Sequence, residues 1–120
     1  MNETELKNRT KKFALRVIRL VESLPHSNTA NVIGRQLLRS ATSVGANYRS
    51  ACMGRSRVDF AAKIGIALEE ADESAYWMEL MIDAGLVPED RMTELLSEAK
   101  EIVSILVASL KTTRRNTGKE

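Results

Sequence analysis

The most informative segment of the chain is RVDFAAKIGIALEEADESAYWMELMIDAG, residues 57–85. Its apolar residues recur every three or four positions, as on one face of an α-helix. These residues are Phe60, Ile64, Ala67, Ala71, Ala75, Met78 and Ile82. Ser56, followed three residues later by Asp59, has the spacing of a helix-capping pair, and Gly85 is suited to end a helix. The segment therefore predicts one long amphipathic helix.

Three other segments show the same periodicity. The first covers about 4–24 and ends at Pro25, because the residue before a proline resists helical geometry. The second covers about 29–53, and the last begins near Pro88 and continues to about residue 112. Their core-facing residues are expected to be Leu6, Phe13, Val17, Leu20 and Leu24, then Ile33, Leu37, Val44, Tyr48 and Ala51, and finally Met92, Leu96, Ala99, Val103, Leu106 and Leu110.

Four such helices joined by short loops predict an all-α fold, an antiparallel up-down-up-down four-helix bundle. Residues 1–112 are expected to form its single domain, with residues 113–120 as a flexible basic tail. The 120 residues are 43% hydrophobic and 28% charged, which is typical of an ordinary globular chain. No apolar run reaches the length of a membrane span, and the N-terminus has no apolar signal core. With the single cysteine, Cys52, these features predict a cytoplasmic protein without a membrane partner.

Residue patterns that carry catalysis or metal binding are missing from the sequence. His26 lies in a loop beside a proline, and a bundle that holds two metal ions needs Glu-x-x-His units on facing helices. Cys52 has no histidine near it in sequence, and no glycine-rich loop joins a strand to a helix. We therefore expect no catalytic, cofactor-binding or metal-binding residues, no cofactor, no small-molecule substrate and no enzymatic activity.

Charge is distributed unevenly along the chain. Residues 23–58 contain five arginines and no acid, whereas residues 59–101 contain twelve acids and three basic residues. In one interpretation the two sets meet, within the chain or between copies. The expected charge network consists of Arg39, Asn47, Arg49, Arg55, Arg57, Glu70 and Glu73. In the rival interpretation basic side chains bind RNA or DNA phosphates, and the candidate contacts are Arg35, Arg39, Arg49, Arg114 and Arg115.

A second apolar strip lies opposite the core stripe of the helix over 57–85. It includes the only tryptophan and is interrupted by two acids; its residues are Ala62, Ile66, Glu69, Glu73, Tyr76, Trp77 and Leu80. Scattered exposed hydrophobic residues are common on monomers. A row that continues over several turns favours an interface with another subunit.

The runs RSATSVGANYRSA (39–51), RSRVDFAAKIGIALEEADESAYWMELM (55–81) and DAGLV (83–87) resemble a bacterial family of four-helix-bundle proteins. These are related to the intervening-sequence proteins, some of which are encoded within large-subunit ribosomal RNA genes. The resemblance covers roughly residues 8–110. It implies an antiparallel four-helix bundle and a ring-like homopentamer, and it implies no defined biochemical function. A related accessory protein of diversity-generating retroelements binds a reverse transcriptase and nucleic acid.

The family pattern matches this chain at Arg39, Ser40, Ala41, Ser43, Ala46, Asn47, Arg55, Ser56, Asp59, Phe60, Glu70, Glu73, Tyr76 and Trp77. Ser50 departs from it, because relatives usually have an acid there that could pair with Arg49 or Arg55. The leading hypothesis is a non-enzymatic, self-assembling interaction protein. The alternative is an RNA- or DNA-binding accessory protein that uses the arginine-rich helix over 29–53.

Overall fold

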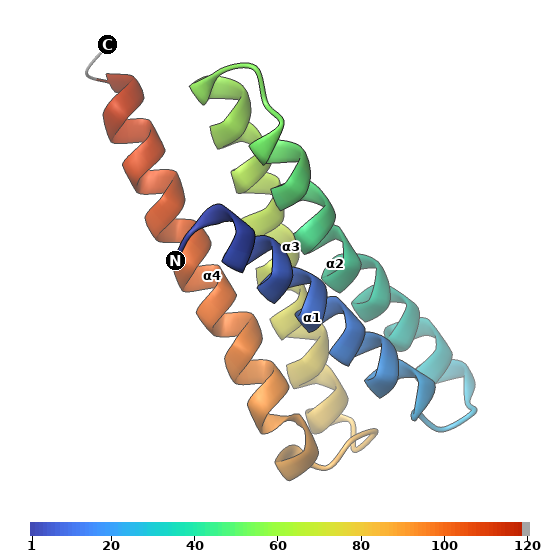
Figure 1. Ribbon diagram of the computed structural model, residues 1–120. Helices are drawn as coiled ribbons and strands as arrows, with labels where there is room; N and C mark the ends of the chain where they lie inside the picture. Colours follow the sequence, from blue (N-terminus) through green and yellow to red (C-terminus); the bar gives the residue numbers. More distant parts are fainter. Residues whose placement is uncertain (119–120) are drawn as a thin grey trace.

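The computed structural model describes residues 1–118 and contains four helices in that range. They are α1 (Glu3–Glu22), α2 (Asn28–Cys52), α3 (Arg57–Asp83) and α4 (Glu89–Gly118). Consecutive helices run in opposite directions and are joined by short loops (Figure 1). The bundle is elongated, with extents of 52 × 21 × 20 Å. This arrangement confirms the predicted all-α four-helix bundle.

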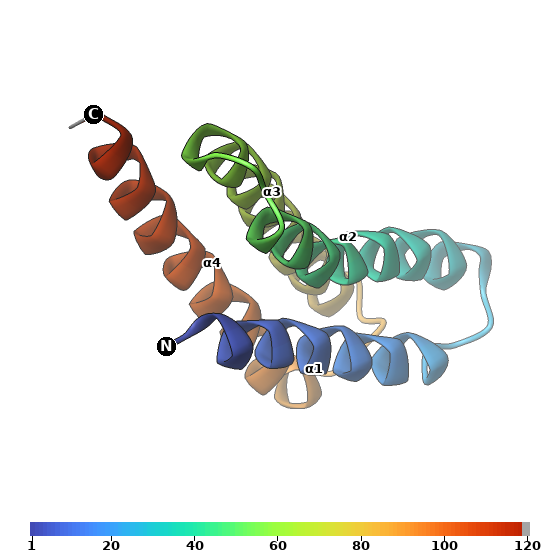
Figure 2. The same cartoon turned by 45° about the horizontal axis from the view of Figure 1, so that its top comes forward.

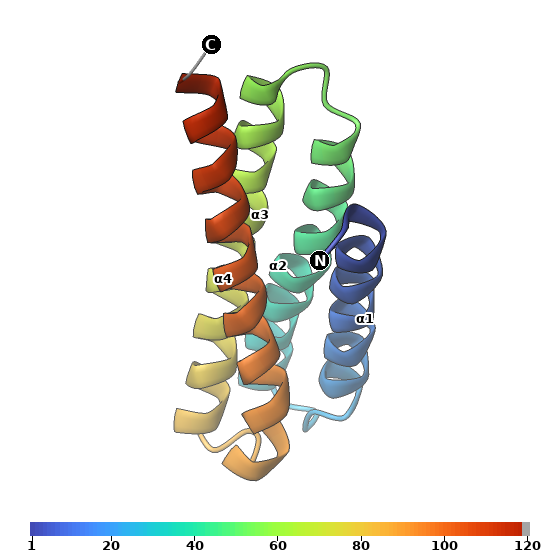
Figure 3. The ribbon, with the colours of Figure 1, turned by 60° about the vertical axis from the view of Figure 1, so that its left-hand side comes forward.

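The four helices do not contribute equally to the packing. Helix α2 packs extensively against both α1 and α3, and α3 also packs against α4, whereas α1 has its smallest contact with α4. Figure 2 shows α4 diverging from α1 toward the C-terminus. Helix α1 is also the shortest, so the last turns of α4 and the α2–α3 loop extend beyond its N-terminal end (Figure 3). One end of the bundle is therefore built from three helices.

Local sequence signals account for the helix ends. The side chain of Ser56 accepts a hydrogen bond from the amide of Asp59 at 3.0 Å, as the capping pair predicts, and Ser27 caps α2 in the same way by accepting one from the amide of Ala30 at 3.1 Å. Gly85 has a φ of 75°, a left-handed conformation that glycine adopts without strain, and it follows the end of α3. Both loops on either side of α3 are thus specified by their sequences.

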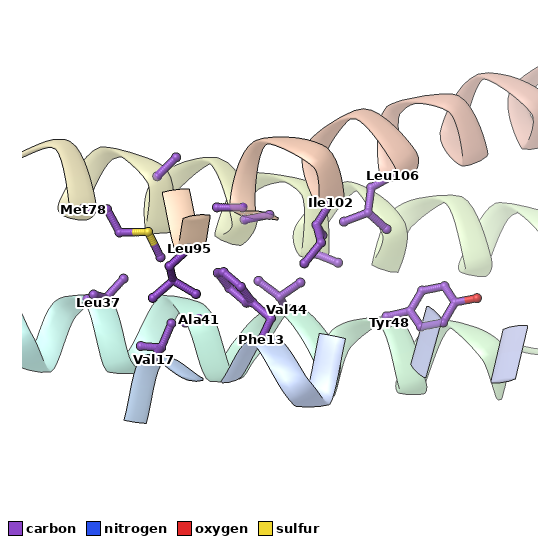
Figure 4. Packing of buried hydrophobic residues seen from close by; sticks show 14 of the residues in the cluster. Phe13, Val17, Leu37, Ala41, Val44, Tyr48, Met78, Leu95, Ile102 and Leu106 are labelled. Carbon is purple, nitrogen blue, oxygen red and sulfur yellow. The ribbon is translucent and has the colours of Figure 1, made fainter. Parts of the chain in front are cut away.

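Side chains from all four helices meet in one interior. Figure 4 shows Phe13 of α1, Val44 of α2, Met78 of α3 and Leu106 of α4 directed into the same cluster. Most of the predicted core residues are buried; those that are only half-buried are Leu20, Ile33, Phe60, Ile82, Leu96 and Val103. The core also includes apolar residues that the periodicity did not select, among them Ala30, Ala41, Met81, Leu95 and Ile102.

Helix α4 is longer than predicted. The sequence pattern ended the domain at residue 112 and assigned residues 113–120 to a flexible tail. In the structure α4 continues to Gly118. The helix continues past its last buried apolar residue, Leu110, through a polar segment in which Lys111, Arg114 and Arg115 are good helix formers. The rest of the predicted tail, residues 119–120, lies outside the described residues.

Candidate interaction surfaces

The outer strip of α3 consists of Ala62, Ile66, Glu69, Glu73, Tyr76, Trp77 and Leu80, and we call it the α3 strip. Ile66 and Tyr76 are 45% and 55% exposed and belong to the same side of the helix, so they form part of a continuous row and are not isolated exposed residues. Ala62 and Glu69 are exposed as well, whereas Glu73, Trp77 and Leu80 are half-buried. Because α2 and α4 pack against the other sides of α3, the exposed members remain open to a partner.

Contacts within the α3 strip hold its aromatic residues in place. The rings of Tyr76 and Trp77 lie 5.1 Å apart between centroids, with an interplanar angle of 72°, which is an edge-to-face arrangement. The indole Nε1 of Trp77 donates a hydrogen bond to Glu73 Oε2 at 3.1 Å. The exposed ring of Tyr76 therefore packs against Trp77, whose own position is fixed by its hydrogen bond to Glu73.

Part of the predicted charge network is present at the α2–α3 seam. Nη1 of Arg39 lies 3.1 Å from Glu70 Oε2, and the same guanidinium also pairs with Glu73. At the same seam the buried hydroxyl of Ser74 donates to the buried hydroxyl of Ser40 at 3.0 Å. Together these contacts set the register of α3 on α2.

The other predicted members of the network lie elsewhere in the protomer. The side-chain amide of Asn47 donates to the backbone carbonyl of Ser43 at 2.8 Å, so it does not bond to the carboxylates as expected. Arg49 and Arg55 are exposed, and neither forms an ion pair within residues 1–118. Arg57 is exposed at the start of α3. The network within one copy therefore centres on Arg39.

A basic face covers the seam between α1 and α2, and we call it the α1–α2 face. It includes a surface groove of about 520 Å³, lined by Lys7, Asn8, Thr10, Lys11, Ala14, Thr42, Gly45, Ala46 and Arg49. Two exposed apolar side chains of α1, Leu15 and Ile18, follow the groove residues Lys11 and Ala14 along the helix, whereas the exposed Val32 lines a separate hollow on α2 with Arg35 and Arg39. Arg35 is exposed on the outer side of α2. Cationic and apolar groups therefore share one surface.

The candidate nucleic-acid contacts fall into three environments. Arg39 is engaged by the carboxylates of α3, whereas Arg35 and Arg49 form no ion pair within the part of the chain that the structure describes. Arg114 and Arg115 are exposed on the last turns of α4. Figure 1 places those turns at the end of the bundle where α2 terminates. Four of the five candidates are thus available to an anion.

An ion pair between α1 and α4 was not foreseen from the sequence. Nε and Nη2 of Arg9 donate to the two carboxylate oxygens of Glu98 at 2.8 and 2.7 Å, and Nη2 also lies 3.0 Å from Glu101. The hydrogen bond to Glu98 is the main reason why the pKa of Arg9 is raised above its usual value. The only feature of the sequence that could have indicated this contact is that α1 contains basic residues and α4 contains acidic residues.

Two titratable side chains adjoin the N-terminal end of α1. Burial, together with a contact to Cys52, raises the pKa of the Tyr48 hydroxyl, and burial also raises the pKa of the Cys52 thiol. Both groups are therefore neutral near pH 7. A protonated thiol is a poor nucleophile, so Cys52 is not activated in this environment.

Residues 1–118 lack two other kinds of functional feature. Within them no cluster of three or more histidine, cysteine, aspartate or glutamate side chains is placed to hold a metal ion. No helix in that range is long and apolar enough to cross a membrane. What distinguishes this bundle is its α3 strip and its α1–α2 face.

The fold and these surfaces define a small four-helix-bundle protein with exposed apolar and charged surfaces. The chain belongs to the 23S rRNA-intervening sequence protein family, whose model matches residues 2–108. This finding confirms the resemblance inferred from the sequence motifs. No functionally curated protein matches the chain.

A solved structure with the same fold comes from Bacteroides thetaiotaomicron VPI-5482. It is described as a protein with unknown function from the S23 ribosomal protein family. The two chains are 35% identical and superpose with a TM-score of 0.86. The match covers 92% of this chain and 99% of the other, so the similarity extends over the whole bundle.

Proposed function

We propose that this protein is a non-enzymatic, cytoplasmic, self-assembling helical bundle whose role is interaction. A homopentamer is the assembly that the family resemblance implies. The observation that carries the proposal is the exposure of Ile66 and Tyr76 on one side of α3. Both belong to a row that continues through Ala62 and Leu80 over several helical turns.

Physical arguments connect this row to an interface. Apolar side chains lie on two sides of α3, and the packing of α2 and α4 leaves Ile66 and Tyr76 on the outer side exposed. Tyrosine and tryptophan are enriched in interfaces because they bury a large apolar area at a low cost in conformational entropy. The edge-to-face contact between Tyr76 and Trp77 reduces that cost further by holding both rings.

Light scattering coupled to gel filtration at micromolar concentration tests the proposal. We expect a mass that is a multiple of the chain mass of 13.4 kDa, five times that mass for a pentamer. Replacing Ile66→Asn together with Tyr76→Ser should reduce the assembly to monomers without unfolding, because both side chains are already largely exposed. Met53→Asn is the matched control, since Met53 is 77% exposed in the α2–α3 loop and lies outside the strip. A strictly monomeric wild-type protein would refute self-assembly.

RNA or DNA binding is the second candidate function. It is supported by Arg35 and Arg49, which are exposed and form no ion pair within residues 1–118, and by Arg114 and Arg115 at the far end of α4. Exposed arginines bind phosphates, and this binding weakens steeply as salt displaces it. We expect retention on RNA at low salt that is lost in an Arg35→Glu, Arg49→Glu variant. Absence of retention at low salt would eliminate this function.

A further inference from the structure

We infer that the α3 strip of one copy docks on the α1–α2 face of the next copy, so that the subunits associate head-to-tail. This inference rests on the proposed self-assembly, and it identifies the surface that receives the strip. It depends on three features of the described residues: unmatched charges, the repulsion that other pairings would create, and the shape of the groove between α1 and α2.

The two surfaces have opposite charges that remain unmatched within one copy. On α3, Glu69 and Asp72 are exposed and form no ion pair within residues 1–118, and Asp72 lines the same surface hollow as Tyr76. On the α1–α2 face, Lys11 and Arg49 are likewise exposed and without an ion pair in that range. Each surface therefore presents charge that a second copy can neutralise.

Like-with-like pairing is electrostatically unfavourable for either surface. Two α3 strips facing each other would bring Glu69 and Asp72 against the same acids of the other copy. Two α1–α2 faces would oppose lysines and arginines in the same way. Charge complementarity therefore favours a contact between two different faces, the α3 strip of one copy and the α1–α2 face of the next. Such head-to-tail contacts form a closed ring when the rotation from one subunit to the next adds up to a full turn, and a filament when it does not.

The groove has the shape to receive a helix. Its lining combines the small residues Ala14, Gly45 and Ala46 with the basic side chains of Lys7, Lys11 and Arg49. Helices α1 and α2 approach closely here, since a Cβ on Gly45 would lie 3.2 Å from Thr10 Oγ1. A groove lined by small and cationic residues fits a helix ridge that carries both apolar and acidic groups.

The α3 strip provides such a ridge. Ile66, Glu69, Glu73 and Tyr76 follow one another at intervals of three and four residues, so they share one side of the helix. Leu15 and Ile18 follow the groove residue Ala14 along α1, and they are exposed apolar side chains that Ile66 and Tyr76 can bury. The acidic side chains of the α3 strip therefore have basic counterparts on the α1–α2 face, and its apolar side chains have apolar counterparts there.

Charge reversal on each surface tests the pairing. Variant A carries Glu69→Lys and Asp72→Lys on α3, and variant B carries Lys11→Glu and Arg49→Glu on the α1–α2 face. Each variant alone should lose assembly, with an apparent dissociation constant raised at least about tenfold. A one-to-one mixture of A and B should form A–B contacts, because the intact strip of B meets the intact face of A and the reversed strip of A meets the reversed face of B; an alternating ring closes only with an even number of subunits, so the mixture is not expected to restore a pentamer. A chain carrying all four changes should also assemble.

Matched controls place the same charge changes on α4. Glu94→Lys and Lys111→Glu alter exposed side chains outside both surfaces and should leave the assembly unchanged, and circular dichroism should show native helix content in every variant. A monomeric wild-type protein would refute self-assembly itself. If the wild type assembles and variant B assembles equally well, the α1–α2 face is not the receiving surface. Normal assembly of B with loss of RNA retention would assign that face to nucleic acid and would also overturn the inference.

Discussion

The ion pair between Arg9 and Glu98 is expected to secure the weakest seam of the bundle. Helix α1 contacts α4 less than any other neighbouring pair of helices does, and this bidentate contact crosses that seam with bonds of 2.8 and 2.7 Å. The two side chains are only 24% and 17% exposed. The guanidinium of Arg9 is charged wherever the protein is folded, and its hydrogen bond to Glu98 raises its pKa further.

The expected energy lies between the values for surface pairs and for buried pairs. Exposed ion pairs contribute about 0.2–1 kcal/mol, whereas removing one partner of a buried pair costs about 3–5 kcal/mol. Partial burial and bidentate geometry place the coupling between Arg9 and Glu98 at about 1–2 kcal/mol. Glu101, at 3.0 Å, remains as a second acceptor for Arg9, so Glu98→Gln should cost less than Arg9→Met, which leaves a half-buried carboxylate without a counter-ion.

A double-mutant cycle measures this coupling. Wild type, Arg9→Met, Glu98→Gln and the double variant are unfolded in urea and followed by circular dichroism, at one protein concentration because assembly itself would stabilise the fold. For a domain of this size, 1 kcal/mol corresponds to a shift in melting temperature of about 3–6 °C. The coupling should fall when NaCl is raised from about 0.05 M to about 1 M. A coupling energy below about 0.3 kcal/mol, or one that is the same at both salt concentrations, would refute the reasoning.

Three further changes have defined expectations. Gly65→Ala should raise the free energy of unfolding by roughly 0.5–1 kcal/mol in urea denaturation, since no neighbouring atom lies within 4 Å of the position that a Cβ would occupy there and glycine is a poor helix former. Ser40→Ala should cost about 1 kcal/mol, and Ser40→Ala combined with Ser74→Ala should cost less than the sum of the two single changes, as measured in the same assay. Because the pKa values of Tyr48 and Cys52 are raised in the folded state, the unfolded chain releases these protons first and stability should fall as pH rises above about 9. Tyr48→Phe should reduce that decline in pH-dependent urea titrations, and an unchanged decline would contradict it.

The fold could be predicted because its signals are local. The stripe from Phe60 to Ile82 depends only on the helical period, and the caps at Ser27 and Ser56 depend on a side chain and an amide three residues away. The end of α4 was placed too early because a polar helix continuing past Leu110 has no apolar stripe to reveal it. Periodicity marks the buried part of a helix, and the exposed remainder leaves no trace in that pattern.

Polar core residues were missed for a related reason. Thr10, Ser40 and Ser74 are fully buried, yet a search for apolar residues at helical spacing passes over them. Thr10 lies four residues after Leu6 and three before Phe13, at a core position of α1. Each of their hydroxyls has a hydrogen-bond partner, which makes the burial possible. A polar residue at a core position is the signal that could have identified them.

The handedness of the bundle explains why the arginines of α2 could not be sorted from the sequence. A helical pattern gives the angle of each side chain around its own axis, and Arg39 and Arg49 differ in that angle by roughly 80°. The same angles, however, are compatible with a bundle of the opposite handedness, in which α1 lies where α3 lies in this structure and α3 lies where α1 lies. In the structure Arg39 points to the α3 side and pairs with Glu70, whereas Arg49 lines the groove shared with α1.

Because of this placement, the basic residues of 23–58 and the acids of 59–101, which are separate segments of the sequence, also leave unpaired charge on separate surfaces of the folded protein. Arg49 joins Lys7 and Lys11 of α1 on one surface, and the acids of α3 that Arg39 does not reach remain on another. With the opposite handedness Arg49 would lie on the α3 side and Arg39 on the α1 side, so Arg49 would no longer share one surface with Lys7 and Lys11. The head-to-tail contact is therefore a consequence of bundle handedness, and reversing Lys11 and Arg49 without touching α3 tests that consequence directly.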